Sequence, residues 1–360
     1  MNKRIVLSVI ALLLCACLLA GCGSTAAPAA PAQEDPAPAA EPAPETEAAP
    51  ETEAAPETEA TPGIDASLPV RVYTLNGTTG FGMAGLIAEA AEGRAALNYS
   101  FSVESDPSVV TAALVSGDCD LAALPTNAAS ALYNKTGGKV QVLALNTRGV
   151  LYVLTDGSVP VESLEDLAGQ TVYAPAQNPS FILEALCGAR GVELTIDNSY
   201  AQPAELNAAV AAGEVGLAVL PEPMVTVACA QNKALTAALD LSAEWDAVME
   251  PGSLVQGCVA VRREFAEAHG AELACFLEEY GRSVALLEED AQAAAQKIEQ
   301  AGIFANAAVA AKAIPRCNIC FVTGEDMQRQ LSVFLQTMFE TAPQSIGGSV
   351  PGDDFYYIAP

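Results

Sequence analysis

The feature that most constrains the fold is a regular alternation of strand and helix patterns from Leu68 to Val261, followed by a mostly helical stretch to about Phe339. The strands are short aliphatic and β-branched runs, such as LPVRVYTL at 68–75. The helices between them begin and end at capping residues, proline or glycine, as where Asp106 caps a helix with Pro107 at its first position. This alternation predicts parallel sheets covered by helices.

The pattern runs once to about residue 150 and then restarts, so we expect an α/β fold with two lobes. We predict strands at 68–75, 99–103, 121–124, 140–145, 149–154, 171–174, 194–196, 215–220 and 254–261. We predict helices at 83–91, 107–115, 127–133, 163–167, 179–189, 203–212, 224–231, 265–287, 291–300, 309–314 and 325–339. Lobe 1 is expected to comprise 65–150 and 255–360, with a helical C-terminal segment, and lobe 2 to comprise 151–254.

The first residues form a targeting signal. Lys3 and Arg4 precede an apolar run of about 15 residues, which is shorter than the roughly 20 that a spanning helix needs. The run ends in LAGC at 19–22, which resembles the bacterial lipobox. This resemblance implies a signal peptide over 1–21 and a diacylglycerol on the Cys22 thiol. The alternative is a plain secretory signal with a chance cysteine.

Residues 22–64 form a low-complexity linker with repeats of APETEA. Residues 23–62 contain no aromatic residue and no Ile, Leu or Val, so we predict that this stretch is a disordered tether. About 40 such residues could reach on the order of 100 Å.

Composition excludes several classes of function. The formal net charge is −28, which argues against binding nucleic acid. His269 is the single histidine, so multi-histidine zinc sites are excluded, and we interpret it as a surface residue. Seven of the ten cysteines lie beyond Cys22, an odd number that does not suggest a disulfide framework. Cys317 and Cys320 form a CxxC, which is either a weak redox or metal motif, a local disulfide or two free thiols.

Three phrases resemble a known family in their order along the chain. They are VTAALVSGDCDLAALP at 110–125, SLEDLAGQTV at 163–172 and LPEPM at 220–224. With the small-residue loop at 76–82 and the lipobox upstream, the chain resembles a type II periplasmic-type solute-binding protein of an ABC importer, of the nitrate, sulfonate, taurine and thiamine-precursor group. The resemblance implies the periplasmic-binding-protein type II fold, with two hinged lobes and a ligand cleft between them.

Ligands of open α/β sheets bind beyond the carboxyl ends of strands. Three loops meet this condition, and each contains candidate ligand-binding residues. The alternative is that these residues only form turns or cap helices. The candidates are Asn76, Gly77, Thr78, Thr79, Gly80 and Phe81 in the first loop, Thr126 and Asn127 in the second, and Gln177, Asn178 and Ser180 in the third. Tyr73 and Phe81 either stack on a ligand ring or belong to the core.

Two charged candidates complete the predicted site. Arg148 lies at the crossing between lobes and either pairs with a carboxylate or sulfonate or is a surface or hinge arginine. Glu222, between two prolines, either accepts from a cationic ligand or holds a hinge through backbone bonds.

We therefore expect a solute-binding lipoprotein rather than an enzyme, on the outer face of the bacterial cytoplasmic membrane. Its expected partners are a small solute, an ABC permease and the membrane through Cys22. We expect a monomer with no cofactor, no metal and no nucleic acid. The alternatives are a lipid-anchored sensor or surface interaction protein on the same fold, or an enzyme related to menaquinone-pathway members of the fold.

Overall fold

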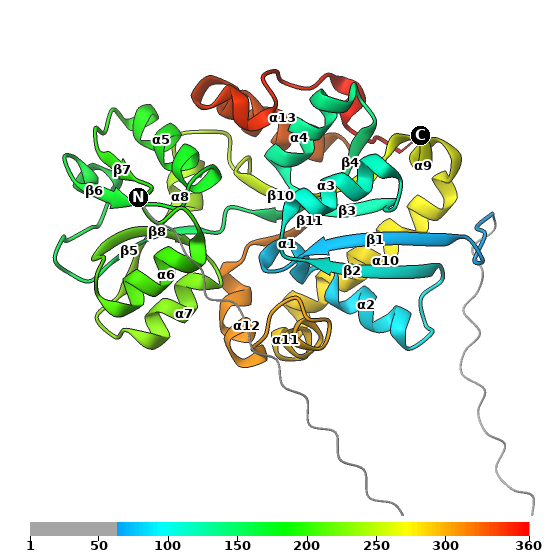
Figure 1. Cartoon of the computed structure of the whole chain (residues 1–360), viewed down its shortest axis with the longest axis horizontal. Helices are drawn as coiled ribbons and strands as arrows, with labels where there is room; N and C mark the ends of the chain where they lie inside the picture. Colours follow the sequence, from blue (N-terminus) through cyan, green and yellow to red (C-terminus); the bar gives the residue numbers. More distant parts are fainter. Residues whose placement is uncertain (1–62, 360) are drawn as a thin grey trace, which may run out of the picture. The chain divides into compact units, whose positions relative to one another are not determined.

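A computed structural model describes residues 63–359, which contain two sheets flanked by helices (Figure 1). The strands are β1 (Pro69–Leu75), β2 (Asn98–Glu104), β3 (Leu121–Pro125), β4 (Val140–Arg148), β5 (Leu151–Thr155), β6 (Thr171–Tyr173), β7 (Thr195–Asp197), β8 (Leu217–Pro221), β9 (Thr236–Asp240), β10 (Val255–Arg262) and β11 (Ile319–Val322). The α-helices are α1 (Thr78–Phe81), α2 (Ala84–Ala91), α3 (Pro107–Ser116), α4 (Thr126–Thr136), α5 (Asn178–Arg190), α6 (Pro203–Ala212), α7 (Met224–Gln231), α8 (Leu241–Asp246), α9 (Arg263–Ala268), α10 (Gly270–Glu289), α11 (Ala291–Gln300), α12 (Ala307–Ala313) and α13 (Gly324–Thr341). Short 3₁₀ turns lie at η1 (Leu164–Leu167), η2 (Ile314–Arg316), η3 (Pro343–Ile346) and η4 (Asp353–Phe355).

The first sheet has the strand order β11-β4-β10-β3-β1-β2 and the second has the order β7-β6-β8-β5-β9. In the first sheet β1 pairs in parallel with β2 and β3, whereas β10 runs antiparallel to both β3 and β4. In the second sheet β6 pairs in parallel with β7 and β8, and β5 runs antiparallel to β8 and β9. Both sheets are therefore mixed, but four of the six strands of the first sheet and four of the five strands of the second run in the same direction, as the expectation of mostly parallel sheets requires. Strands β5, β10 and β11 run the other way. The reason is that β5 and β10 enter their sheets without the crossover helix that makes neighbouring strands parallel.

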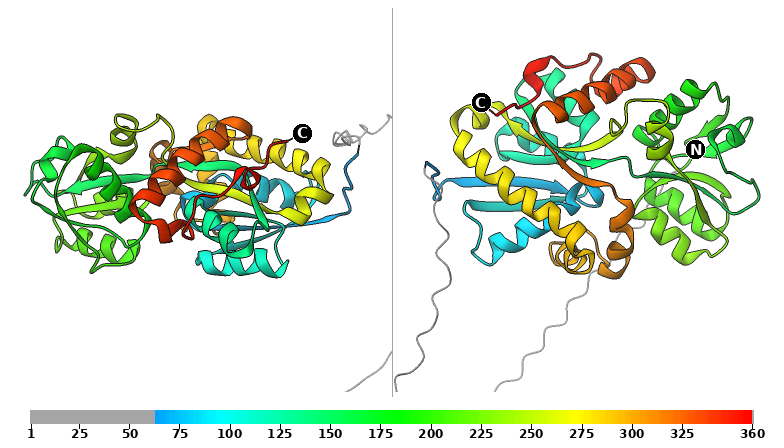
Figure 2. Two further views of the ribbon diagram at one scale, coloured as in Figure 1. Left: turned by 90° about the horizontal axis from the view of Figure 1, so that it is seen from above. Right: turned by 180° about the vertical axis from the view of Figure 1, so that it is seen from behind.

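Helix α10 covers one face of the first sheet, as the right view of Figure 2 shows. Its side chains Leu273, Phe276 and Tyr280 are fully buried against strand residues such as Leu121 and Val259. An α-helix presents such a stripe when apolar residues recur every three to four positions, as these do. The packing fixes the part of the sheet from which the predicted loops emerge.

The largest apolar cluster contains side chains from both sheets. Leu145 of β4, Val153 of β5 and Phe334 of α13 all belong to it and are fully buried. The rings of Phe334 and Trp245 lie 6.0 Å apart, so α13 packs against the segment that leads from the second sheet back to the first. The predicted helical C-terminal segment therefore contacts elements of both sheets.

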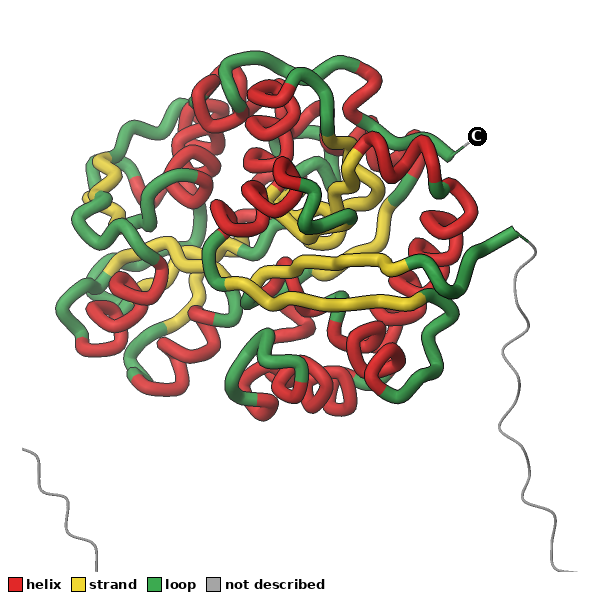
Figure 3. The backbone as a smooth tube through the Cα atoms, turned by 45° about the vertical axis from the view of Figure 1, so that its right-hand side comes forward, coloured by secondary structure: helices red, strands yellow, loops and turns green. Residues whose placement is uncertain are grey.

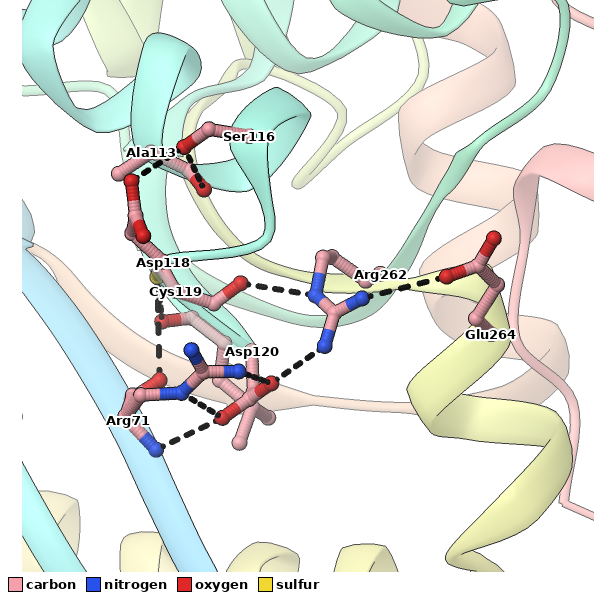
Figure 4. Close-up of polar contacts among 9 residues, drawn as sticks. Arg71, Ala113, Ser116, Asp118, Cys119, Asp120, Arg262 and Glu264 are labelled. Atoms are coloured by element: carbon pink, nitrogen blue, oxygen red, sulfur yellow. Dashed lines mark hydrogen bonds and ion pairs between the residues drawn. The ribbon is translucent and has the colours of Figure 1, made fainter.

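The Gly-Asp-x-Asp phrase at 117–120 has a structural role at the start of β3. Gly117 ends α3 in a left-handed conformation (φ 84°), which glycine adopts without strain. Asp120 is nearly fully buried and accepts hydrogen bonds from Arg71 at the start of β1 and from Arg262 at the end of β10 (Figure 4). The carboxylate thus ties three neighbouring strands together at the end of the sheet opposite the loop Thr126–Asn127.

Most predicted elements are found within a few residues of their expected bounds, with five differences. Helix α1, strand β9, helix α8 and strand β11 were not predicted; Figure 3 distinguishes helices, strands and loops by colour. The helix predicted over 265–287 is two helices, because the chain breaks at His269. The partly exposed ring of His269 lies 4.6 Å from that of Phe265. Asp106 caps α3 through Ser108 N, as predicted.

Candidate functional site

The connection between the two sheets is built around Gly149, in the two-residue link between β4 and β5. Its carbonyl oxygen accepts hydrogen bonds from Nδ2 of Asn318 (2.6 Å) and from Oγ of Ser242 (2.9 Å). A Cβ at Gly149 would lie 2.3 Å from Ser242 Oγ, so glycine is required for this close approach. Three chain segments that are distant in sequence therefore meet at one peptide group.

The loop after β1 is only partly available to a ligand. Asn76 is exposed and Gly77, Thr78 and Thr79 are partly exposed, but residues 78–81 form the short helix α1 ahead of the expected helix start. The N–H of Gly77 donates to the carbonyl of Ile303, which comes from the segment between α11 and α12.

The last two residues of this loop are buried. A Cβ at Gly80 would lie 2.0 Å from the carbonyl oxygen of Leu75, which explains the glycine. Phe81 is fully buried in an apolar cluster and packs edge-on against Phe304 at 6.2 Å between ring centroids. Phe81 therefore belongs to the core and does not stack on a ligand ring, because its side chain has no accessible surface. Tyr73 is partly buried against the cluster beneath α3 and α4.

The loops after β3 and β6 meet. Nδ2 of Asn178, the first residue of α5, donates to Oδ1 of Asn127 in α4 at 2.9 Å. Asn127 in turn donates from Nδ2 to the carbonyl of Ser345 at 3.4 Å. The Oδ1 atom of Asn178 is buried and has no hydrogen-bond partner among the described residues. One amide acceptor is thus left free at a contact between an element of the first sheet and one of the second.

The neighbours of this asparagine pair are structural. Thr126 is fully buried, and its hydroxyl donates to the carbonyl of Val255 at 2.7 Å, so it joins β3 to β10 rather than capping α4. Ser180 donates to Pro175 and accepts from Asn198, which fixes the loop before α5. Gln177 is exposed, adopts φ 70° and makes no side-chain cap for α5.

Glu222 is buried and has partners that no sequence pattern indicates. Its carboxylate accepts from the N–H and the hydroxyl of Thr226, and Nε of Arg316 lies 3.3 Å from Oε1. The Arg316 guanidinium lies 4.3 Å above the ring of Tyr152, whose hydroxyl donates to the Arg316 carbonyl. One of these partners is a backbone N–H, as in the alternative in which Glu222 holds a hinge through backbone bonds, and Arg316 already supplies a cation to the carboxylate.

Burial raises the pKa of the Glu222 carboxyl, although the bonds from Thr226 and the charge of Arg316 oppose the shift. The charge on Glu222 is therefore sensitive to any change that moves Arg316.

Arg148, the last residue of β4, lines a cavity of about 370 Å³ together with Asn318, Cys320 and side chains of α10. None of the candidate residues of the three loops lines this cavity. The structure thus separates the predicted site into the asparagine contact and the Arg148 cavity. Asn318 and Arg316 were missed because they lie more than 90 residues beyond the nearest predicted candidate, Glu222, outside any predicted loop.

The CxxC cysteines are both thiols: Cys317 is fully buried and Cys320 partly exposed. Burial raises the pKa of Cys320 to about 12, so its thiol is a weak nucleophile at neutral pH. Within residues 63–359 no group of three or more His, Cys, Asp or Glu side chains is placed to hold a metal ion. The leader, Cys22 and almost all of the linker lie outside the described residues.

Comparison with known proteins places this geometry in context. The model of a family described as "Menaquinone biosynthesis" matches residues 86–313. No curated protein matches the chain. Across residues 63–359, no helix combines the length and apolar character that a membrane span requires.

Several solved structures resemble the chain. An ABC transporter protein from Parabacteroides distasonis is 21% identical with a TM-score of 0.69, over 81% of this chain and 99% of that one. The periplasmic aliphatic sulphonate binding protein SsuA from Escherichia coli is 16% identical with a TM-score of 0.64, over 81% and 92%. The ligand-binding component of an ABC-type import system from Staphylococcus aureus is 13% identical with a TM-score of 0.61, over 81% and 96%. These likenesses confirm the predicted two-lobed α/β fold.

Proposed function

This chain belongs to the menaquinone biosynthesis family and has the fold of ABC-transporter solute-binding proteins, and from that fold we propose that it captures a small solute between two lobes and delivers it to an ABC permease. The observation that carries this proposal is the contact between Asn127 and Asn178, where predicted site loops from the two sheets meet. Amide groups facing one another across two lobes suit reversible binding of a polar solute. The proposed lobes are 65–150 with 255–360, and 151–254.

The leader supports an extracytoplasmic location. A lipobox cysteine at Cys22, followed by a Pro-, Ala- and Glu-rich stretch, is the arrangement of a protein anchored by acyl chains and held away from the membrane surface. The proposed place is the outer face of the bacterial cytoplasmic membrane. A Cys22→Ala variant should leave the membrane fraction and appear in the medium, whereas a Cys15→Ala variant should stay membrane-bound.

Binding would act through the link at Gly149. A solute that contacts both lobes stabilises the closed arrangement by its differential affinity for that state. The bonds from Ser242 and Asn318 to the Gly149 carbonyl would change as the lobes move. The apolar cluster shared through α13 favours a small closure, since a large one would expose buried side chains such as Phe334.

The family match favours a second function, an enzyme of the menaquinone pathway type. Its best candidate for acid–base chemistry is Glu222, a buried carboxyl with a raised pKa. Arg316 and Thr226 already occupy that carboxylate, which weakens the case for catalysis. A lipid-anchored sensor on the same fold is a third reading, supported by the same leader.

A thermal-shift screen of the mature protein against small solutes tests the proposal. Saturating ligand adds about 3 kcal/mol to the free energy of unfolding at 100 times the dissociation constant, so one solute class should raise the melting temperature by several degrees. Native mass spectrometry should show the same solute bound one to one and recovered unchanged after incubation. Chemical conversion of the solute would instead support the enzyme, and binding by no solute would reject the proposal.

A further inference from the structure

The cavity at the end of β4 is a candidate binding site separate from the asparagine contact. Its walls are apolar where Val284 and Leu287 of α10 and Ile319 of β11 line it. Arg148 and Asn318 contribute polar groups to the wall of the cavity nearest the link between the sheets. Its volume of about 370 Å³ lies within the range of roughly 300–1,000 Å³ that small-molecule sites occupy.

Arg148 differs from every other arginine that the structure describes. Residues 63–359 contain nine arginines, and the other eight each form an ion pair with Asp or Glu. Arg148 forms none, and its Nε is buried with no hydrogen-bond partner among the described residues. Carboxylates greatly outnumber cations in this chain, with 44 acidic and 16 basic residues, so an arginine without a carboxylate partner is unexpected.

The surroundings of Arg148 hold it in place without neutralising it. Gly252, in the loop before β10, packs against the guanidinium, since a Cβ there would lie 3.7 Å from Arg148 Cζ. The backbone N–H of Arg148 donates to the carbonyl of Asn318 at 3.0 Å. Glu288 also lines the cavity, but it is exposed and forms no ion pair with Arg148. A partly buried cation without a partner is costly, and an anion from solution would offset that cost.

We propose that this cavity binds a small organic monoanion, whose carboxylate or sulfonate group pairs with Arg148 and whose apolar body packs against Val284, Leu287 and Ile319. All residues that line the cavity belong to the proposed lobe 1, so it is a second site beside the proposed capture between the two lobes, and it rests on the proposed function only for its biological role. One guanidinium balances one negative charge, and Glu288 disfavours a second. The planar fork of arginine suits either head group because it donates two parallel hydrogen bonds.

The test measures binding to the mature protein with a panel of linear and aromatic carboxylates and sulfonates of two to eight carbons. Each acid is paired with its neutral amide or sulfonamide, which keeps the shape and removes the charge. At least one acid should bind by calorimetry with one-to-one stoichiometry, and its neutral partner should bind at least tenfold more weakly. Equal binding of acid and neutral partner would overturn the proposal.

Two variants locate the site independently. Arg148→Gln should weaken binding of the acid at least tenfold, and Arg148→Lys should recover part of the loss. Ala291→Phe, on the α11 side of the cavity, should weaken binding by filling the space while Arg148 stays intact. Arg94→Gln is the matched control, because it removes the same charge from an exposed arginine paired with Glu92 and should bind the acid as the unaltered protein does. Circular-dichroism melts establish that each variant is folded.

The outcomes separate this inference from the proposed function. If the panel acids bind Arg148→Gln and Ala291→Phe as tightly as the unaltered protein, the cavity proposal fails, and solute capture between the lobes is decided by the wider screen alone. If the panel acids bind through Arg148 but no solute is delivered to a permease in reconstituted membranes, the cavity stands and the transport role fails. If neither the panel nor the wider screen yields any ligand, both fail.

Discussion

The carboxylate of Asp120 accepts a 2.6 Å hydrogen bond from Nη2 of Arg262, which joins the residue before β3 to the last residue of β10. Arg71 binds the same carboxylate through Nε at 2.8 Å and Nη2 at 2.6 Å (Figure 4). The Asp120 side chain is 2% exposed, whereas that of Arg71 is 38% exposed. The bonds therefore hold a buried anion between two cations that both stay in contact with water, Arg71 more than Arg262.

Replacing Asp120 with Asn should destabilise the protein by about 2–3 kcal/mol, because two arginines lose their shared anion. This loss is smaller than the roughly 3–5 kcal/mol that breaking a fully buried ion pair costs, because Arg71 stays hydrated. Urea denaturation measures the change in the free energy of unfolding. Asp118→Asn, at an exposed neighbour that bonds only to Ser116, should change it by less than about 0.5 kcal/mol. Equal effects of the two substitutions would contradict the structural role of Asp120.

The same carboxyl predicts a pH dependence. Burial acts to raise the pKa of Asp120, but the hydrogen bonds from Arg71 and Arg262 outweigh it and hold the pKa below its usual value. A depressed folded-state pKa adds stability above the unfolded pKa of about 3.9, and this stability is lost as the pH falls through the folded pKa. The stability difference between the unaltered protein and Asp120→Asn should therefore shrink below about pH 4. A difference that is constant from pH 7 to pH 2 would show that Asp120 does not titrate in this way.

Gly149→Ala tests the close approach at the link between the sheets. The added methyl would lie 2.3 Å from Ser242 Oγ and 2.5 Å from Leu254 Cδ2, so the free energy of unfolding should fall by about 1–3 kcal/mol. Gly188→Ala is a matched control within α5, where a Cβ meets no atom within 4 Å. It should stabilise by about 0.5–1 kcal/mol, because alanine favours the helix. If Gly149→Ala is neutral in denaturation experiments, the link is more adaptable than its packing indicates.

The Asn127–Asn178 bond predicts a coupling energy. Asn127→Ala, Asn178→Ala and the double variant form a cycle whose interaction term should be about 0.5–1.5 kcal/mol in the free energy of unfolding. Asn178→Ala should cost less than Asn127→Ala, because it also removes the buried Oδ1 that lacks a partner. Strict additivity of the two substitutions would mean that the contact adds nothing to the free energy of unfolding.

Much of the architecture follows from local patterns in the sequence. Capping residues and glycines mark the ends of α3 and α6, and the predicted bounds of α6 match the observed ones. Strand β9 was missed because its sequence TAALD is rich in alanine, which favours helices, so pairing with β5 decides its conformation. Strand β11 has only four residues and depends on β4 for its pairing.

The candidate site was less predictable, because partners come from distant segments. Local patterns identify Asn127 and Asn178 as residues that follow strands, yet nothing in either loop indicates that the two amides meet. The role of Glu222 depends on Arg316, which lies in the turn η2 and carries no motif. The antiparallel direction of β10 was missed for a similar reason, since its return into the first sheet is a long-range event.

The shared carbonyl of Gly149 offers a single-atom reporter of lobe motion. Two hydrogen bonds from segments distant in sequence converge on that oxygen, so any rotation of one lobe against the other alters its polarisation. If the proposed lobes close on a solute, an isotope label on that carbonyl carbon would report the closure as a shift in its infrared and magnetic resonance signals, without a bulky dye attached to either lobe.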